Sequence, residues 1–187
     1  MDEKSRAARS DEMALPIMCA READRLVALD GYEILDTPAE AGFERIVRLA
    51  REVFGTPIAL ISFVGADRQW FKAKIGLAID GTDRSAAFCN ATIGGTDVLC
   101  VSDALADPRF RDSALVTGPE GIRFYAGAPL LTADGLALGA LCIMDRAPRP
   151  PLSVRKSGLL RDLAAQVMSE LELRREIAAG RRAAAIA

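Results

Sequence analysis

The sequence predicts an α+β fold in which helices sandwich a central antiparallel sheet of five strands. Three observations support this fold class. Five β-rich segments follow one another through the middle of the chain, amphipathic helices are expected near both ends, and no internal repeat is visible. At 187 residues the chain is long enough for one domain with a substantial core and extended termini.

Composition excludes several classes of function. Half of the residues are apolar, 27% are charged and the formal net charge is −2, so the basic excess that a nucleic-acid-binding surface needs is missing. No apolar run reaches the roughly 18 residues that span a bilayer, and the charged N-terminus lacks the apolar core of a signal peptide. We therefore expect a cytoplasmic protein whose partners are neither nucleic acid nor membrane.

The chain contains no histidine. This excludes histidine acid–base chemistry, Ser/His and Cys/His nucleophile pairs, and imidazole ligation of a metal or haem. The four cysteines, Cys19, Cys89, Cys100 and Cys142, are far apart and form no CxxC pair, so we expect free thiols in a reducing compartment. No metal site is predicted, and Cys142, in an apolar strand, is expected to be a buried, inert thiol.

The N-terminal part is predicted to contain an arm and two helices. Residues 1–20 are rich in charged and small residues, which is typical of a flexible arm. A short helix is expected over Arg21–Leu29. Thr37-Pro38-Ala39-Glu40 has the pattern of a capping box with Thr37 as the N-cap, and the apolar stripe that follows ends at Gly55.

The middle of the chain alternates short β-rich runs with irregular segments. The expected elements are strands over Pro57–Val64 and Arg68–Ile75, an irregular segment over Gly76–Ser85, a short helix over Ala86–Ile93, a strand over Asp97–Asp103 and a polar loop over Ala104–Gly118. Loops as long as the last of these are often binding loops or lids.

A β-hairpin and a long helix are predicted at the C-terminal end. Apolar runs over Phe124–Leu131 and Leu136–Met144 flank the turn signal Ala133-Asp134-Gly135. The second run is apolar on both faces, so it should lie inside the sheet. After a break rich in charge and proline, Leu152–Ile177 reads as one helix that turns charged beyond Leu171, and we treat residues 172–187 as its extension.

Four segments in this order resemble a GAF domain, the small-molecule sensor module of bacterial signalling proteins. They are YEILDTPAEAGFERIVRLAREVFGTPIALISFVGADRQWFKAKIGL, FCNATI, VSDALADPRF and RFYAGAPLLTADGLALGALCIMDRAPRP, within a single domain expected over residues 21–171. The resemblance is to the subgroup found at the N-terminus of sensor histidine kinases and diguanylate cyclases. It implies a GAF/PAS-like antiparallel sheet of five or six strands. The terminal helices would pack on one face, and a ligand pocket with short helices and loops on the other.

The resemblance also implies where a ligand would bind. The candidate ligand-binding residues are Phe88, Cys89, Asn90, Asp103, Asp107, Arg109, Phe124 and Tyr125. Core packing by Phe88, turn capping by Asn90 and loop bracing by the two aspartates are the competing interpretations. Alternation along a strand turns only one of Phe124 and Tyr125 toward the pocket, and the sequence leaves that choice open.

The sequence departs from the subgroup at one informative position. Relatives carry a histidine two residues after the cysteine of the FC motif, where this chain has Ala91. Bilin and haem are therefore not expected as cofactors, and the ligand stays unknown.

Three functions of different classes follow. The favoured one is a non-catalytic sensor that passes ligand occupancy through the C-terminal helix to a homodimer or to a signalling partner such as a histidine kinase, another two-component protein or a cyclase. The second is a thiol enzyme resembling free methionine sulfoxide reductases, with Cys89 and Cys100 as the reacting pair. That lineage has a further cysteine in the loop corresponding to Ala104–Gly118, which has none here. The third is a dimerisation or scaffold module without a ligand.

Overall fold

The computed structural model of the protein describes residues 21–86 and 88–186. The expected arm over residues 1–20 and Cys19 lie outside these ranges. Six antiparallel strands form one sheet in the order β3-β2-β1-β6-β5-β4. This confirms the α+β class, with one strand more than the residue pattern predicts and within the five or six that the resemblance implies. Their bounds are β1 Ile58–Val64, β2 Arg68–Ile75, β3 Gly81–Asp83, β4 Leu99–Val101, β5 Phe124–Leu131 and β6 Ala137–Asp145.

The predicted hairpin is formed by β5 and β6 at the centre of the sheet. β6 pairs with β5 on one side and with β1 on the other. Every residue of β6 except Asp145 is buried, which confirms that its two apolar faces are both covered. The prediction of an irregular segment over Gly76–Ser85 is wrong in one respect, because β3 lies within it. A three-residue edge strand is too short to show a period of two in the sequence.

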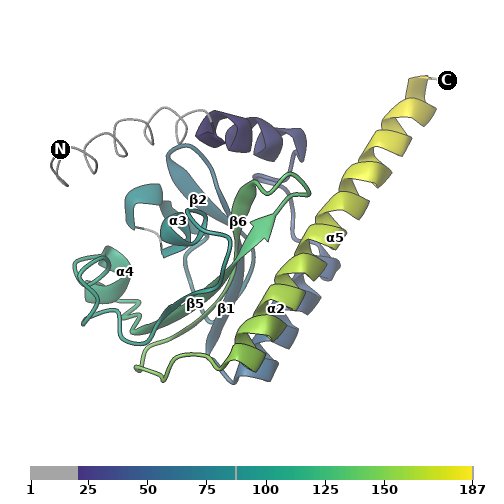
Figure 1. Cartoon of the computed structure of the whole chain (residues 1–187). Coiled ribbons are helices and arrows are strands. Elements are labelled where there is room, and N and C mark those ends of the chain that lie inside the picture. The colour runs from purple at the N-terminus through teal and green to yellow at the C-terminus, as the bar shows by residue number, and fades with distance from the viewer. Residues whose placement is uncertain (1–20, 87, 187) are drawn as a thin grey trace, which may run out of the picture.

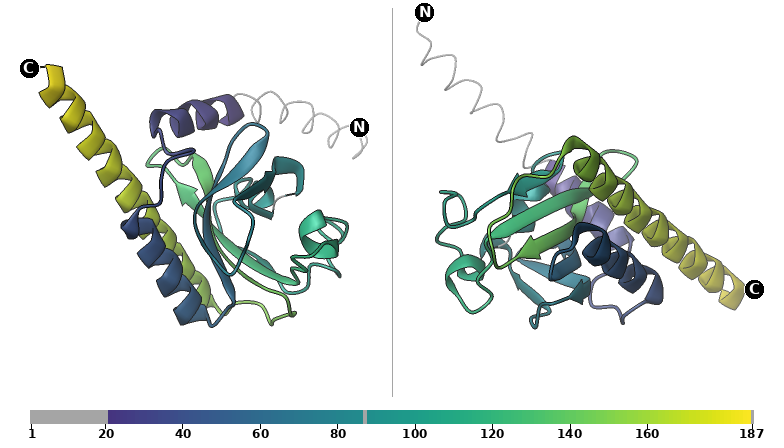
Figure 2. Two further views of the ribbon diagram at one scale, coloured as in Figure 1. Left: turned by 180° about the vertical axis from the view of Figure 1, so that it is seen from behind. Right: turned by 90° about the horizontal axis from the view of Figure 1, so that it is seen from below.

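The helices divide between the two faces of the sheet, as Figures 1 and 2 show. On one face, α2 (Ala41–Phe54) lies beside the first half of α5 (Val154–Ile186). On the other lie the short elements η1 (Arg84–Ala86), α3 (Phe88–Thr92) and α4 (Ala114–Thr117). A further helix, residues 21–31, crosses the end of the sheet near the turn from β1 to β2.

The start of α2 differs from the capping-box prediction. The N-cap is Glu40, whose side chain makes no capping hydrogen bond. Instead the Lys72 ammonium donates to Thr37 Oγ1 at 2.8 Å and to Glu40 Oε1 at 2.7 Å. The buried lysine from β2 therefore binds both side chains that a capping box would use. As a result the helix begins at Ala41, three residues after Pro38, the first helical residue that the motif predicts. Its end is as predicted, with Gly55 in the left-handed region at φ 58°.

Two apolar clusters fill the space on either side of the sheet. Strand alternation sorts the side chains between them. One cluster joins the sheet to α2 and α5 and contains Ile61, Phe124 and Leu141. The other joins the sheet to α3, α4 and their loops and contains Leu60, Tyr125 and Cys142.

The terminal helix outgrows the domain. Its first turns bury Leu160, Val167 and Leu171 against the sheet. Its 33 residues correspond to about 50 Å, and the second half projects away from the sheet (Figure 1). Leu173 and Ile177 on this projecting half are 51% and 46% exposed. None of the helices in the described ranges is long and apolar enough to cross a membrane.

Candidate functional site

A buried cluster of two thiols and two hydroxyls lies between α3 and the sheet. Cys89 from α3 and Cys142 from β6 place their Sγ atoms 3.3 Å apart. The Tyr125 hydroxyl lies 2.6 Å from Thr92 Oγ1, 3.4 Å from Cys142 Sγ and 3.7 Å from Cys89 Sγ. These polar atoms satisfy one another in a region closed to solvent.

Aromatic rings complete this cluster. The ring of Phe88 stacks on Tyr125 with centroids 4.9 Å apart, and the ring of Phe110 also packs against Phe88, at 4.6 Å. The space between α3 and the sheet is therefore filled by the chain's own side chains. Phe88, Cys89 and Tyr125, three of the candidates, meet here.

The surroundings set the acidity of the three ionisable groups. A hydrogen bond from the Cys142 thiol lowers the pKa of Cys89. Burial raises the pKa of Cys142 and of Tyr125 well above their ordinary values. Of the two thiols, Cys89 is thus the one that ionises more readily.

The structure settles the choice between Phe124 and Tyr125. Tyr125 faces α3, whereas Phe124 belongs to the cluster under α2 and α5. The prediction that Phe124 lines the pocket is therefore wrong, because alternation along β5 turns its side chain to the opposite face of the sheet.

The polar candidates of the long loop pair with arginines. Asp103 accepts two hydrogen bonds of 2.7 Å from the Arg123 guanidinium, which lower the pKa of Asp103. Arg109 does the same for Asp107, at 2.9 and 2.6 Å. Both aspartates also accept from backbone amides of the loop, which fits the loop-bracing interpretation.

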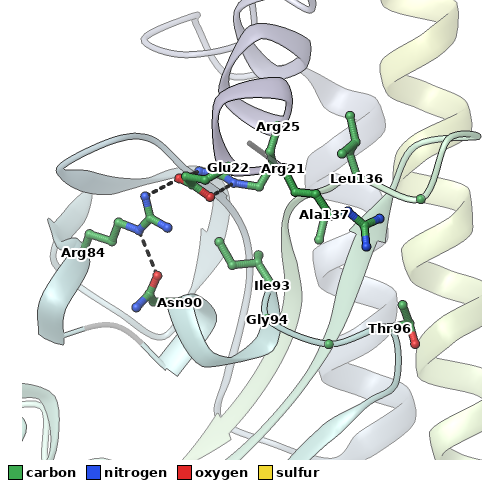
Figure 3. Close-up of a pocket in the computed structure, with 12 residues that line it drawn as sticks. Arg21, Glu22, Arg25, Arg84, Asn90, Ile93, Gly94, Thr96, Leu136 and Ala137 are labelled. Carbon is green, nitrogen blue, oxygen red and sulfur yellow. Dashed lines mark hydrogen bonds and ion pairs between the residues drawn. The ribbon is translucent and has the colours of Figure 1, made fainter. Parts of the chain in front are cut away.

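An open cavity of about 450 Å³ lies beyond α3 (Figure 3). Helix 21–31, the turn between β5 and β6, Arg84 and the end of α3 form its walls. Its lining residues are Arg21, Glu22, Arg25, Arg84, Asn90, Ile93, Gly94, Gly95, Thr96, Gly135, Leu136 and Ala137. Asn90 is the only candidate among them. The cavity was missed because tertiary packing of helix 21–31 creates it, and no local motif marks its residues.

Charged groups on one wall of the cavity form a connected network. Glu22 accepts from Arg25 at 2.8 Å through both carboxylate oxygens and from Arg84 at 2.6 Å. The bonds from Arg25, joined by those from Arg84, outweigh burial and lower the pKa of Glu22 to about 2. Arg84 Nε also donates to Asn90 Oδ1 at 2.8 Å. The described lining thus holds three arginines and one glutamate, an excess of two positive charges.

The wall of the cavity continues to α5. Thr96 lines this cavity and also a smaller one of about 140 Å³ whose other residues include Arg161, Ala165 and Met168 of α5. The next residue, Asp97, lies 3.3 Å from Arg161. The segment after α3 therefore contacts both the cavity and the terminal helix, and Thr96 stands between them in Figure 3.

Comparison with known sequences assigns the family. A sequence model described as the GAF domain matches residues 38–171, well over half of the chain. The chain belongs to the GAF domain family. Its similarity to a protein of Pseudomonas aeruginosa named cyclic di-GMP phosphodiesterase PA2567 is 47% identity over 159 residues. That match covers 85% of this chain but 27% of the relative, so the chain spans about a quarter of that protein's length.

Solved structures show the same GAF fold. The GAF domain of an Acinetobacter phosphoenolpyruvate-protein phosphotransferase aligns with a TM-score of 0.60 at 17% identity, covering 81% of this chain and 92% of that one. Free methionine-R-sulfoxide reductase from Neisseria meningitidis aligns with a TM-score of 0.59 at 16% identity, covering 79% and 87%. At these identities the likeness concerns the fold.

The cysteines of this GAF domain do not fit the alternative function, a thiol reductase with Cys89 and Cys100 as the reacting pair. Cys89 belongs to the cluster under α3, whereas Cys100 packs with the cluster under α2 and α5. The sheet therefore separates the two sulfurs, and one cannot resolve an intermediate formed on the other. The sulfur beside Cys89 is instead that of Cys142, whose place in an apolar strand predicts a buried, inert thiol.

Proposed function

We propose that this GAF domain is a non-catalytic sensor that binds a small anionic molecule in the cavity and transmits its occupancy through α5. The observation that carries the proposal is the cavity itself. It has room for a small molecule, its described lining has an excess of positive charge, and its lining residue Thr96 also lines the smaller cavity beside the terminal helix.

The lining favours an anion that also has an apolar part. Arg21 is exposed and makes no hydrogen bond or ion pair with any residue in the described ranges, so its guanidinium is available to a ligand. Arg84 uses Nε and Nη1 for protein contacts, which leaves Nη2 to face a carboxylate or phosphate. Ile93, Leu136 and Ala137 offer an apolar floor. Carboxylates and phosphate esters of small organic molecules have this combination of properties.

Transmission would use the segment after α3. A ligand can shift α5 only if it binds one arrangement of the helix better than another. Thr96 lines the cavity and the next residue, Asp97, pairs with Arg161 of α5, so a ligand that orders this segment would favour one position of the helix. The exposed Leu173 and Ile177 on the extension would then change how α5 pairs with a second subunit or with a partner.

The candidates other than Phe124 take different parts in this proposal. Asn90 would contact the ligand directly, held in place by Arg84. Phe88, Cys89 and Tyr125 would support the cavity from behind, because they hold α3 on the sheet. Asp103, Asp107 and Arg109 would brace the long loop, whose Phe110 packs on Phe88 of α3.

The output would lie in another part of a signalling protein. The relative in Pseudomonas aeruginosa carries a phosphodiesterase name, and this chain matches 27% of it. We propose that α5 connects the sensor to a kinase, cyclase or phosphodiesterase unit, joined covalently or by association.

Native mass spectrometry tests ligand binding. The protein is incubated with the dialysable small-molecule fraction of a bacterial extract, desalted gently and weighed. The wild type should retain a small non-covalent adduct, and Arg21→Gln, which breaks no hydrogen bond within the described chain, should lose most of it. Arg155→Gln, at an exposed position of α5, is the matched control and should keep it. Absence of any adduct, or equal adducts on all three proteins, would refute the proposal.

A further inference from the structure

The thiol pair under α3 has a geometry that the sensor function does not use. Cys89 and Cys142 are 53 residues apart in sequence and belong to different elements, yet their sulfurs are 3.3 Å apart. A disulfide bond is about 2.05 Å long, so the sulfurs need to approach by little more than 1 Å. α3 packs directly on β6, and a small movement of this short helix would supply that approach.

We infer that Cys89 and Cys142 form a reversible intramolecular disulfide in the presence of a peroxide, which makes the junction of α3 and β6 a redox modification site. This inference is independent of the ligand and of the cavity's charge. It concerns a covalent state of the folded domain and assigns no enzyme activity.

The reaction can be written in two balanced steps. In the first, the Cys89 thiolate attacks one oxygen of hydrogen peroxide, the O–O bond breaks, and Cys89 becomes a sulfenic acid. The departing hydroxide takes up the one proton that the Cys89 thiol released and leaves as water. In the second, the Cys142 sulfur attacks the sulfenic sulfur of Cys89, the S–O bond breaks, and the hydroxide leaves as water with the Cys142 proton. The two thiols lose two electrons in all, and the peroxide becomes two molecules of water.

The surroundings assign these roles to the two sulfurs. The hydrogen bond from Cys142 lowers the pKa of Cys89, which makes Cys89 the attacking thiolate. The Tyr125 hydroxyl lies 3.7 Å from Cys89 Sγ and 3.4 Å from Cys142 Sγ, where it can stabilise negative charge on either sulfur. Cys100 lies on the other side of the sheet and takes no part.

Access of the oxidant requires local opening of α3, because both sulfurs are fully buried. α3 has only five residues and is followed by Gly94 and Gly95, so it has little stability of its own. We therefore expect oxidation of the pair to be slower than oxidation of the partly exposed Cys100, and to be limited by this opening.

The test uses the double variant Cys19→Ser/Cys100→Ser, which keeps only the pair. The folded protein is treated with hydrogen peroxide, then denatured, alkylated with iodoacetamide and weighed intact. We expect a loss of two hydrogen atoms and no alkylation, and dithiothreitol before alkylation should restore two alkylated thiols. Two freely alkylated thiols after oxidation, or oxygen addition in place of hydrogen loss, would overturn the inference.

A matched variant tests whether proximity is the cause. Cys19→Ser/Cys142→Ala keeps Cys89 and Cys100, which lie on opposite faces of the sheet, and should form no intramolecular disulfide under the same treatment. An intramolecular disulfide at the same rate in this variant would also contradict the inference. If this variant does not fold, the result with Cys19→Ser/Cys100→Ser decides alone, because that protein keeps the whole cluster intact.

Discussion

The Tyr125 hydroxyl joins α3 to the centre of the sheet. It lies 2.6 Å from Thr92 Oγ1 and touches both thiols of the buried cluster. Because the cluster is closed to water, a polar atom that loses its partner here stays unsatisfied. The pairing therefore contributes to the stability of the α3 side of the domain.

Removing this pairing should destabilise the protein in a non-additive way. Tyr125→Phe and Thr92→Val should each lower the free energy of unfolding by about 1–2 kcal/mol. The double variant should lose less than the sum of the two, because the second substitution removes a group that has already lost its partner. Urea denaturation of the four proteins measures this coupling. Strict additivity would show that the two hydroxyls do not interact.

Glu22 should make the free energy of unfolding depend on pH, and a single substitution can isolate this effect. The pKa of Glu22 is lowered from 4.5 to about 2 in the folded protein. A lowered pKa means that the stabilisation is fully present above pH 4.5 and fades as the pH falls toward 2. The wild type should therefore be more stable than Glu22→Gln at neutral pH, and the difference should shrink steadily below pH 4.5. Chemical denaturation from pH 7 to pH 3 measures it, and a constant difference would contradict the assignment.

At the scale of elements, the contact between β1 and β6 depends on a small residue. Gly139 of β6 pairs with Phe63 of β1, and a Cβ atom at this position would overlap the carbonyl oxygen of Ser62. No side chain can be added there without moving one of the two central strands.

Gly139→Ala should accordingly lower the free energy of unfolding by about 1–3 kcal/mol. Gly158→Ala is the matched control, because nothing lies near an added Cβ at that position of α5. It should raise stability by about 0.5–1 kcal/mol through better helix propensity. Thermal and urea unfolding of both variants compare them. An equal effect of the two substitutions would refute the close approach of the strands.

The elements that the sequence predicted well are those with a strong repeating pattern. The bounds expected for β2 and β5 are those of the structure, and α2 ends at Gly55 as the pattern indicated. The prediction was wrong where tertiary partners decide. Lys72, which is far from α2 in sequence, donates hydrogen bonds to the side chains of Thr37 and Glu40, and the start of the helix is shifted as a result.

The candidate site shows the same division. Side chains alternate between the two faces of a strand, so the sequence predicts that only one of Phe124 and Tyr125 faces α3. Which of the two does so depends on the register of the whole sheet. The cavity was beyond sequence reasoning, because residues of helix 21–31, α3 and the β5–β6 turn meet only in the folded chain. Likewise the proximity of Cys142 to Cys89 has no signal in their spacing of 53 residues.

At the scale of the whole molecule, the charged extension of α5 exposes two large apolar residues. Leu173 and Ile177 are one helical turn apart and about half exposed. Apolar residues at this spacing on a projecting helix are suited to pairing with another helix. This supports the proposed homodimer through the terminal helices.

The double variant Leu173→Glu/Ile177→Glu should shift the protein from dimer to monomer. Charges placed on the paired face repel and lose the burial that holds the helices together. Leu105→Glu is the control, because Leu105 is also exposed, at 46%, but lies on the long loop. Sedimentation equilibrium reads out the mass. A wild type that is monomeric at all concentrations, or a control that dissociates as well, would contradict the proposed dimer contact.

The charge of the molecule sharpens the expectation for the ligand. The chain carries a formal net charge of −2, whereas the described lining of the cavity has an excess of two positive charges. A local field of opposite sign to the whole molecule draws an anion to one place on the surface. Binding should therefore weaken as the salt concentration rises.

Hydrogen exchange with and without the bound adduct tests whether a small molecule in the cavity affects α5. The adduct retained by the wild type is stripped by unfolding and refolding, and amide exchange is compared between the stripped and reloaded protein. We predict slower exchange at residues 93–96 and 135–137 in the loaded form, together with a change in α5 near Arg161. Unchanged exchange around the cavity, or protection confined to another part of the domain, would contradict it.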